Sequence, residues 1–243
     1  MATSESNAAR SADGLITSGY RWVAYFGLMT ISASLIWGFR YQADAPWRNY
    51  LFNGALYAAF MAPHLLMTRS YWKQAVWGST RGSQRERQFY ILLTIVTWLA
   101  VLALHWHVPG PSFSLPTSVR FAGLVGALWS VLLFYQGATR ESLDGLLGVP
   151  GNQVRFSHGE ETPLFTDGPY ADVRHPMYRA AILLGICALV MHPNLGQLFW
   201  TGLVGGTLIA FIPIEEAQLR AARGDDFDRY REATPYRLFR GVW

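Results

Sequence analysis

Long stretches without a charged residue alternate with short charged segments along the chain. The two longest stretches, residues 88–119 and 180–214, contain 32 and 35 residues without Asp, Glu, Lys or Arg. About 20 apolar residues cross the core of a bilayer, so the second stretch is too long for one crossing. Its segment His192-Pro193-Asn194-Leu195-Gly196 contains turn-forming residues that divide it into a helical hairpin. The pattern predicts an all-α, polytopic membrane protein with about six spanning helices, at residues 21–39, 50–68, 88–106, 118–139, 177–192 and 196–214.

The uncharged stretches divide the chain into three parts. Residues 1–20 are polar and rich in Ser and Ala, without the apolar segment of a signal peptide, and predict a disordered cytosolic tail. Residues 21–139 contain the first four predicted spans. Residues 140–243 comprise a polar cytosolic loop, the helical hairpin and a charged C-terminal helix. We therefore expect any chemistry in the loop and in the C-terminal segment, which lie outside the membrane.

Composition supports a membrane location and predicts an orientation. Charged residues make up 15% of the chain, against about 25% in soluble domains, and hydrophobic residues make up 51%. A soluble globular protein and a nucleic-acid-binding protein are therefore excluded. With the N-terminus in the cytosol, 17 of the 20 Lys and Arg residues fall on the cytosolic side, as the positive-inside rule requires. We expect an integral protein of a bacterial inner membrane, with both termini and any active site facing the cytosol.

A dense polar cluster precedes the fifth predicted span. Gly168 and Pro169 are turn residues, and Pro176 can occupy the first turn of a helix because its missing N–H group has no partner there. Arg174 and His175 would then lie at a helix entrance, where exposed N–H groups and the helix dipole favour an anionic ligand. An interfacial turn in which Arg174 binds lipid headgroups is an equally compatible interpretation.

Two carboxylates, Glu215 and Glu216, follow the sixth predicted span. Carboxylates at the point where a helix leaves the membrane are costly unless they are solvated or paired. Because the fifth and sixth spans form a hairpin, these residues can meet the cluster before the fifth span, where Arg174 is the obvious ion-pair partner. A solvated helix end is the alternative. The charged segment 224–235 has its aromatic residues on one helical face, which is typical of a helix lying on a membrane.

Histidines offer few options for metal chemistry. His105 and His107 flank Trp106, and residues two apart diverge on a helix, so we expect no metal site. His64 lies about one turn from the end of the second predicted span, and a polar residue at that depth usually faces a partner or a cavity. A packed interfacial histidine is the alternative for His64. Cys187 is the single cysteine, so the chain forms no intrachain disulfide.

The C-terminal elements together resemble a known family. The run Gly-Pro-Tyr-x-x-Val-Arg-His-Pro-Met-Tyr at residues 168–178 is followed by the apolar hairpin, by Glu215-Glu216 and by a Gly…Phe-x-x-Tyr…Pro segment. This order resembles the membrane methyltransferases of the isoprenylcysteine carboxyl methyltransferase type, over about 75 residues from Gly168 to the C-terminus. The resemblance implies S-adenosylmethionine as the cofactor and residues 140–243 as the methyltransferase core. Membrane sterol reductases contain a related His-Pro-x-Tyr stretch, and such a role would need NADPH instead.

The resemblance also implies where the cofactor binds. The carboxylate of S-adenosylmethionine would bind Arg174 or Arg231, and its amino group or ribose would bind Glu215 or Glu216. Tyrosine rings would stack on the adenine or contact the sulfonium cation. The implied cofactor-binding residues are Gly168, Pro169, Tyr170, Arg174, His175, Pro176, Tyr178, Glu215, Glu216, Tyr230 and Arg231.

The N-terminal half resembles the NnrU-like group of this superfamily, which includes methanethiol S-methyltransferases. The matching elements are His64-Leu65-Leu66-Met67-Thr68-Arg69, Glu86-Arg87-Gln88-Phe89-Tyr90 and Trp106. They imply a small thiol as the methyl acceptor, with methanethiol giving dimethyl sulfide. His64 or His175 is then the candidate catalytic group that assists loss of the thiol proton. The expected partners are the lipid bilayer and a small thiol or lipophilic acceptor. A prenylcysteine carboxylate, a phospholipid amine and a non-catalytic protein with the same fold remain alternatives, and the oligomeric state is left open.

Overall fold

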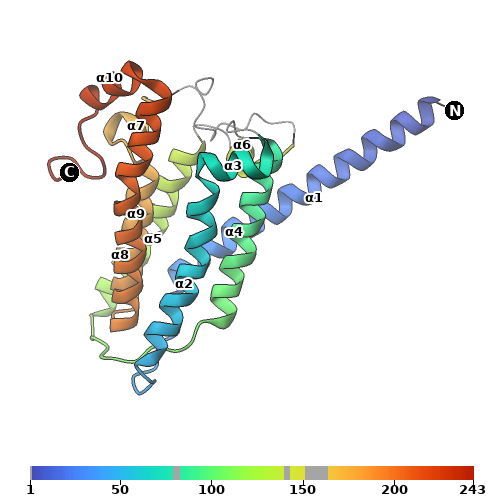
Figure 1. Cartoon of the computed structure of the whole chain (residues 1–243). Coiled ribbons are helices and arrows are strands. Elements are labelled where there is room, and N and C mark those ends of the chain that lie inside the picture. Colours follow the sequence, from blue (N-terminus) through green and yellow to red (C-terminus); the bar gives the residue numbers. More distant parts are fainter. Residues whose placement is uncertain (1, 79–82, 140–142, 151–163) are drawn as a thin grey trace.

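Helices form all the regular secondary structure in the described part of the chain, which confirms the all-α class. The structure is a computed structural model that describes residues 2–78, 83–139, 143–150 and 164–243. The helices are α1 (Ala2–Trp37), α2 (Arg48–Met67), α3 (Ser70–Trp77), α4 (Gln84–Leu104), α5 (Thr117–Thr139), α6 (Leu143–Leu147), α7 (Pro169–Asp172), α8 (Pro176–Met191), α9 (Leu195–Arg223) and α10 (Asp225–Ala233). Figure 1 shows α2, α4, α5, α8 and α9 side by side in a bundle, with the short helices gathered at one end. Parts of the predicted cytosolic loop, residues 140–142 and 151–163, lie outside the described residues.

Three helices are long and apolar enough to cross a membrane by length and composition. They are α4, α5 and α9, while α8 is apolar but only 16 residues long. Helices α1 and α2 contain the first two predicted spans. Among the described residues, they are not in the set of helices that are apolar enough to cross a membrane. The described residues thus contain three candidate membrane-spanning helices and one shorter apolar helix, which supports a membrane protein, while the predicted count of six spans is not confirmed.

Helix α1 begins earlier than the sequence predicts. The segment assigned above to a disordered tail is helical from Ala2, and α1 extends away from the bundle at its N-terminal end (Figure 1). Alanine is frequent in this segment and has the highest helix propensity. Further along α1, the Tyr20 hydroxyl donates to the Leu147 carbonyl at 2.5 Å, and Tyr25 donates to Asp144 Oδ1 at 2.7 Å. These contacts hold α1 against α6, and α1 continues from there toward the N-terminus as one unbroken helix that begins at Ala2.

The polar residues of α2 satisfy backbone groups at the end of the bundle opposite the short helices. Asn53 Nδ2 donates to the Trp106 carbonyl at 2.9 Å, and Trp106 N donates back to Asn53 Oδ1 at 3.0 Å. Asn49 Nδ2 donates to the His107 carbonyl at 2.7 Å. The chain leaving α4 therefore has partners inside the protein, which matters in a bilayer because lipid tails offer no hydrogen bonds.

Helices α8 and α9 form the predicted hairpin, and α8 packs closely on α5. The Asn194 side chain caps α9 by accepting from Gln197 N at 2.8 Å. Across the hairpin, the Thr201 hydroxyl donates to the Gly185 carbonyl at 3.0 Å. The contact between α5 and α8 depends on small residues, since an added Cβ at Gly126 would lie 2.7 Å from Cys187 Sγ. Glycine is needed at this interface because the two helices approach too closely for a larger residue.

We predict that Gly123→Val lowers the free energy of unfolding by about 1–3 kcal/mol more than Gly202→Val does. An added Cβ at Gly123 would lie 3.0 Å from Val190 Cγ1 and 3.2 Å from the Cys187 carbonyl oxygen, whereas at Gly202 it meets nothing within 4 Å. Both glycines lie inside helices, so the Gly-to-Val change in helix propensity is the same in the two variants and cancels in the comparison. Thermal unfolding in detergent measures the difference, and equal losses in the two variants would contradict the packing argument.

Candidate functional site

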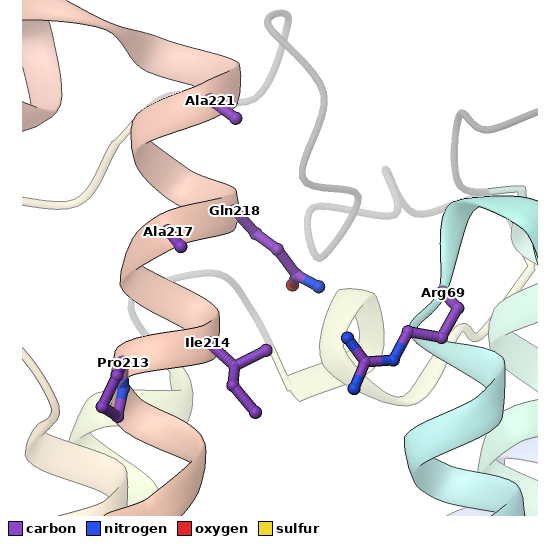
Figure 2. A pocket seen from close by; sticks show the side chains of 6 residues that line it. All are labelled: Arg69, Pro213, Ile214, Ala217, Gln218 and Ala221. Atoms are coloured by element: carbon purple, nitrogen blue, oxygen red, sulfur yellow. The ribbon is translucent and has the colours of Figure 1, made fainter.

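Helix α9 continues beyond its apolar part, and this end has two distinct sides. On one side, Pro213, Ile214 and Ala217 line a cleft of about 480 Å³ that faces Arg69, at the junction of α2 and α3 (Figure 2). On another side, Glu216 faces the turn between α7 and α8. Both sides belong to the same helix end, which also contains Glu215, so we describe them as parts of one candidate site.

The backbone of the turn fixes the positions of Arg174 and His175. Gly168 precedes α7 with a φ of +56°, a conformation that glycine adopts without strain. Pro169 and Pro176 occupy the first turns of α7 and α8, as the sequence predicts. Arg174 and His175 lie between these helices and are 8% and 6% exposed. Arg174 therefore points into the protein rather than toward lipid headgroups.

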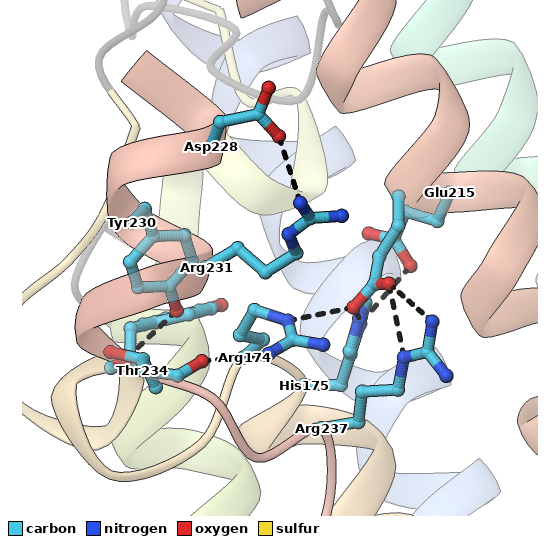
Figure 3. Close-up of polar contacts among 10 residues, drawn as sticks. Arg174, His175, Glu215, Asp228, Tyr230, Arg231, Thr234 and Arg237 are labelled. Carbon is cyan, nitrogen blue, oxygen red and sulfur yellow. Dashed lines mark hydrogen bonds and ion pairs between the residues drawn. The ribbon is translucent and has the colours of Figure 1, made fainter. Parts of the chain in front are cut away.

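Glu216 lies at the centre of a buried ion cluster, and Figure 3 labels its three partners, Arg174, His175 and Arg237. Its Oε1 accepts from Arg174 Nε at 2.8 Å and lies 3.2 Å from His175 Nε2. Its Oε2 accepts from both Nε and Nη2 of Arg237, at 3.0 and 2.8 Å. The Glu216 side chain is 9% exposed, so it is paired and buried rather than solvated. We call Arg174, His175, Glu216 and Arg237 the Glu216 cluster.

His175 lies between two carboxylates. Its Nε2 faces Glu216, and its Nδ1 lies 3.6 Å from Glu215 Oε2. Burial lowers the pKa of His175, but the hydrogen bonds and charges of Glu215 and Glu216 outweigh burial and raise it above its ordinary value. The Tyr178 ring stacks on the imidazole at a centroid distance of 5.5 Å, and its hydroxyl donates to Glu215. The two glutamates, the histidine and this tyrosine therefore form one connected group, as the resemblance implies.

The C-terminal segment 234–243 closes over the turn, and we call it the C-terminal strap. Backbone N–H groups of Arg174 and His175 donate to the carbonyls of Tyr236 and Arg237, both at 2.9 Å. Arg174 Nη1 also donates to the Thr234 carbonyl at 2.7 Å. The entrance of α8 is thus held by backbone pairing with the strap as well as by the ion cluster.

Arg237 is the member of the Glu216 cluster that the sequence analysis does not predict. The prediction assigned Arg231 to the anion site, but Arg231 Nη2 lies 3.5 Å from Asp228 Oδ1, one turn away on α10. Arg237 reaches Glu216 instead, because the chain reverses after α10 and brings the strap back to α9. The sequence contains six arginines between residues 220 and 240, but it does not indicate which of them contacts Glu216.

The tyrosines of the predicted site converge on the turn. The Tyr230 hydroxyl donates to the Tyr170 carbonyl at 2.8 Å and joins α10 to α7. Tyr230 is 6% exposed, and burial raises the pKa of its hydroxyl, with Tyr170 adding to the shift. The structure therefore gathers the tyrosines, the glutamates, Arg174 and His175 around the turn. Arg231 is drawn in the same close-up, where it pairs with Asp228 (Figure 3).

His64 lies between α2 and α4, apart from the Glu216 cluster. Its Nδ1 donates to the Phe60 carbonyl at 2.6 Å, and its Nε2 lies 2.8 Å from Thr94 Oγ1. The Tyr90 ring meets the imidazole edge-on at a centroid distance of 5.2 Å. The structure therefore brings together two elements of the second resemblance, His64 and the segment 86–90. In the described ranges, no three His, Cys, Asp or Glu residues are grouped so that they would hold a metal ion.

Comparison with known proteins supports a methyltransferase relation. No protein-family model matches the chain. Over 191 residues it is 25% identical to a methanethiol S-methyltransferase from Crocosphaera subtropica (strain ATCC 51142 / BH68), which covers 76% of this chain and 72% of that protein. This relative supports a membrane methyltransferase. An alignment of 191 residues also extends beyond the C-terminal elements into the N-terminal helices, so the similarity is not confined to the Glu216 cluster.

We predict that Glu216→Gln lowers the free energy of unfolding by about 3–5 kcal/mol, because it leaves buried cations without a counter-charge. Asp226→Asn is the matched control, since Asp226 pairs with Arg229 through side chains that are 65% and 76% exposed. An exposed pair contributes less than about 1 kcal/mol. Detergent-solubilised variants can be compared by thermal or denaturant unfolding, and similar losses in the two would show that the cluster is not a buried charge centre.

We also predict a pH dependence of stability from His175. Because its folded-state pKa lies above the ordinary value of 6.5, its stabilising charge is fully present below about pH 6.5 and is lost as pH rises through the raised pKa. The difference in thermal midpoint between the native protein and His175→Gln should therefore shrink as the pH is raised. A difference that stays constant or grows with pH would contradict a protonated His175 in the cluster.

Proposed function

We propose that this protein is an integral-membrane methyltransferase that uses S-adenosylmethionine and methylates a small thiol, converting methanethiol to dimethyl sulfide. The observation that carries the proposal is the Glu216 cluster, because it joins the run at residues 168–178 to Glu216 in one buried site. The third element of the resemblance adjoins it, since Arg174 also donates to the Thr234 carbonyl. The methanethiol S-methyltransferase that aligns with most of the chain supports the same reaction class. The contact between His64 and Tyr90 favours the thiol acceptor, because it unites the elements shared with the NnrU-like group.

The groups of the Glu216 cluster fit the chemical groups of S-adenosylmethionine. Arg174 is engaged through Nε and Nη1, and Arg237 through Nε and Nη2. Among the described residues, this leaves the third guanidinium nitrogen of each arginine available for the α-carboxylate. Glu215 and Glu216 suit the amino group or the ribose hydroxyls, and the rings of Tyr178 and Tyr230 suit the adenine or the sulfonium. Bound there, the cofactor supplies an electrophilic methyl group.

The protein contributes binding, orientation and exclusion of water. A methyl transfer needs an in-line approach of the acceptor, so fixing both reactants accounts for much of the rate. The ion cluster and the strap provide a rigid support for one reactant, because their charges are paired from three separate elements. We place this end of α9, and both termini, on the cytosolic side of a bacterial inner membrane, on the basis of the 17 cytosolic Lys and Arg residues.

Cofactor binding tests the first half of the proposal. We predict that Arg237→Gln weakens binding of S-adenosylhomocysteine about tenfold, or 1.4 kcal/mol, the scale of one charge-assisted contact. Arg229→Gln is the control, since Arg229 is exposed and pairs only with Asp226 in the described residues. Calorimetry in detergent measures both affinities. Absence of binding to the native protein would favour a non-catalytic membrane protein and overturn the proposal.

Transfer of labelled methyl groups tests the acceptor. Purified protein is incubated with labelled S-adenosylmethionine and a panel of thiols, prenylcysteine and phospholipids, and the headspace is analysed for dimethyl sulfide. We expect label in volatile sulfide. Label in prenylcysteine or lipid alone would contradict the thiol acceptor and leave the methyltransferase proposal in place.

A further inference from the structure

Among the described residues, the cleft beside α9 is lined by one cationic side chain, that of Arg69 (Figure 2). Its lining consists of Arg69, Gln218, Pro213, Ile214, Ala217 and Ala221, and its volume is about 480 Å³. Small-molecule sites have volumes in this range and are mostly apolar, with few polar groups. Pro213, Ala217 and Ala221 are exposed, so the cleft is open along one side. A small apolar molecule can therefore enter it without passing through the Glu216 cluster.

The charge of Arg69 is not neutralised by the part of the chain that the structure describes. Figure 2 shows its guanidinium directed across the cleft toward Ile214 and Gln218, neither of which is anionic. Glu86, the acidic residue at the start of α4, is paired with Lys73 at 3.0 Å between Oε1 and Nζ. An unneutralised guanidinium in a mostly apolar cleft, whose other polar lining side chain among the described residues is Gln218, favours an anion with an apolar body.

Neither candidate base offers a free ring nitrogen to an acceptor. The Phe60 carbonyl and Thr94 Oγ1 engage the two nitrogens of His64, and Glu215 and Glu216 face the two nitrogens of His175. Neither histidine is among the described residues that line the cleft, so loss of the thiol proton there needs a different means. A neighbouring arginine lowers the pKa of a thiol by stabilising the thiolate, and this needs no protein base.

We propose that this cleft holds the thiol acceptor and that the Arg69 guanidinium binds its sulfur as the thiolate. The inference rests on the proposed function. The thiol proton passes to water, and the thiolate sulfur forms the new bond to the methyl carbon. The bond between that carbon and the donor's sulfonium sulfur breaks, and its electron pair stays on the donor sulfur. The apolar lining limits hydration of the thiolate, which keeps it reactive.

The pH dependence of turnover tests this role of Arg69. At neutral pH, we expect Arg69→Gln to lower kcat/KM for methanethiol about tenfold. This factor corresponds to a rise of about one unit in the pKa of the bound thiol, which leaves about one tenth as much thiolate. The deficit should close at alkaline pH, where the free thiol ionises without help. Arg69→Lys should retain most of the activity at neutral pH, because it keeps the positive charge. Arg229→Gln, on the exposed surface of α10, should behave as the native protein.

A binding measurement gives a readout that does not depend on turnover. A chromogenic aryl thiol, whose thiolate absorbs visible light, is titrated across its ionisation in the presence of protein and S-adenosylhomocysteine. We expect the apparent pKa of the bound thiol to be about one unit lower with the native protein than with Arg69→Gln. Ala217→Leu, which adds volume inside the cleft, should weaken binding of the aryl thiol while leaving that of S-adenosylhomocysteine unchanged.

The outcomes separate this inference from the proposed function. If the native protein produces dimethyl sulfide and Arg69→Gln keeps the native pH profile, the inference is wrong and the proposed function stands. A loss that is equal at every pH, or that is accompanied by weaker S-adenosylhomocysteine binding, would assign Arg69 a structural or cofactor role and also overturn the inference. If the native protein methylates no thiol, both fail. Retention of an anionic phospholipid by native protein but not by Arg69→Gln, with an unchanged pH profile, would assign the cleft to lipid.

Discussion

The burial of Glu216 among Arg174, His175 and Arg237 is the constraint on which this end of the molecule depends. A carboxylate removed from water is costly unless cations and hydrogen bonds replace its hydration. Glu216 obtains them from the turn before α8 and from the C-terminal strap. The turn, α9 and the strap must therefore assemble together, because none of them alone satisfies the charges. The site is consequently built by tertiary contact between segments that are separate in sequence.

The need to replace the hydration of buried polar groups also shapes the rest of the bundle. Where the chain leaves α4, Asn49 and Asn53 provide hydrogen bonds for exposed backbone groups. On the packing face of α5, small residues such as Gly126 allow helices to touch and exclude both water and lipid. Polar groups are thus placed at the two ends of the bundle and apolar contact in its middle. This arrangement holds the Glu216 cluster at one end, on a bundle whose middle combines close apolar contact with a few hydrogen bonds, such as that from Thr201 to the Gly185 carbonyl.

The cationic residues near α9 fall into two groups with different consequences. Arg174 and Arg237 are paired with Glu216, so they are preorganised and have only part of their hydrogen-bonding capacity left for a ligand. Arg69 faces an apolar cleft without such a partner among the described residues, so its charge is available. A group-transfer enzyme needs two binding places beside each other, one for the donor and one for the acceptor. In the proposed function, the two sides of α9 are these two places, with different chemistry.

The sequence by itself determined the features that depend on neighbouring residues. Hydropathy gave the positions of the long helices and the hairpin, and the Pro and Gly residues gave the turn that presents Arg174 and His175, because helix periodicity and turn chemistry are local. Only the tertiary structure decided that Arg237 rather than Arg231 meets Glu216, a contact across 21 residues that depends on the reversal after α10. It likewise decided that both ring nitrogens of His64 are engaged, and that α1 stays helical through the expected tail. Pairing of charges is set by which segments fold onto each other, and a run of arginines in the sequence does not specify that choice.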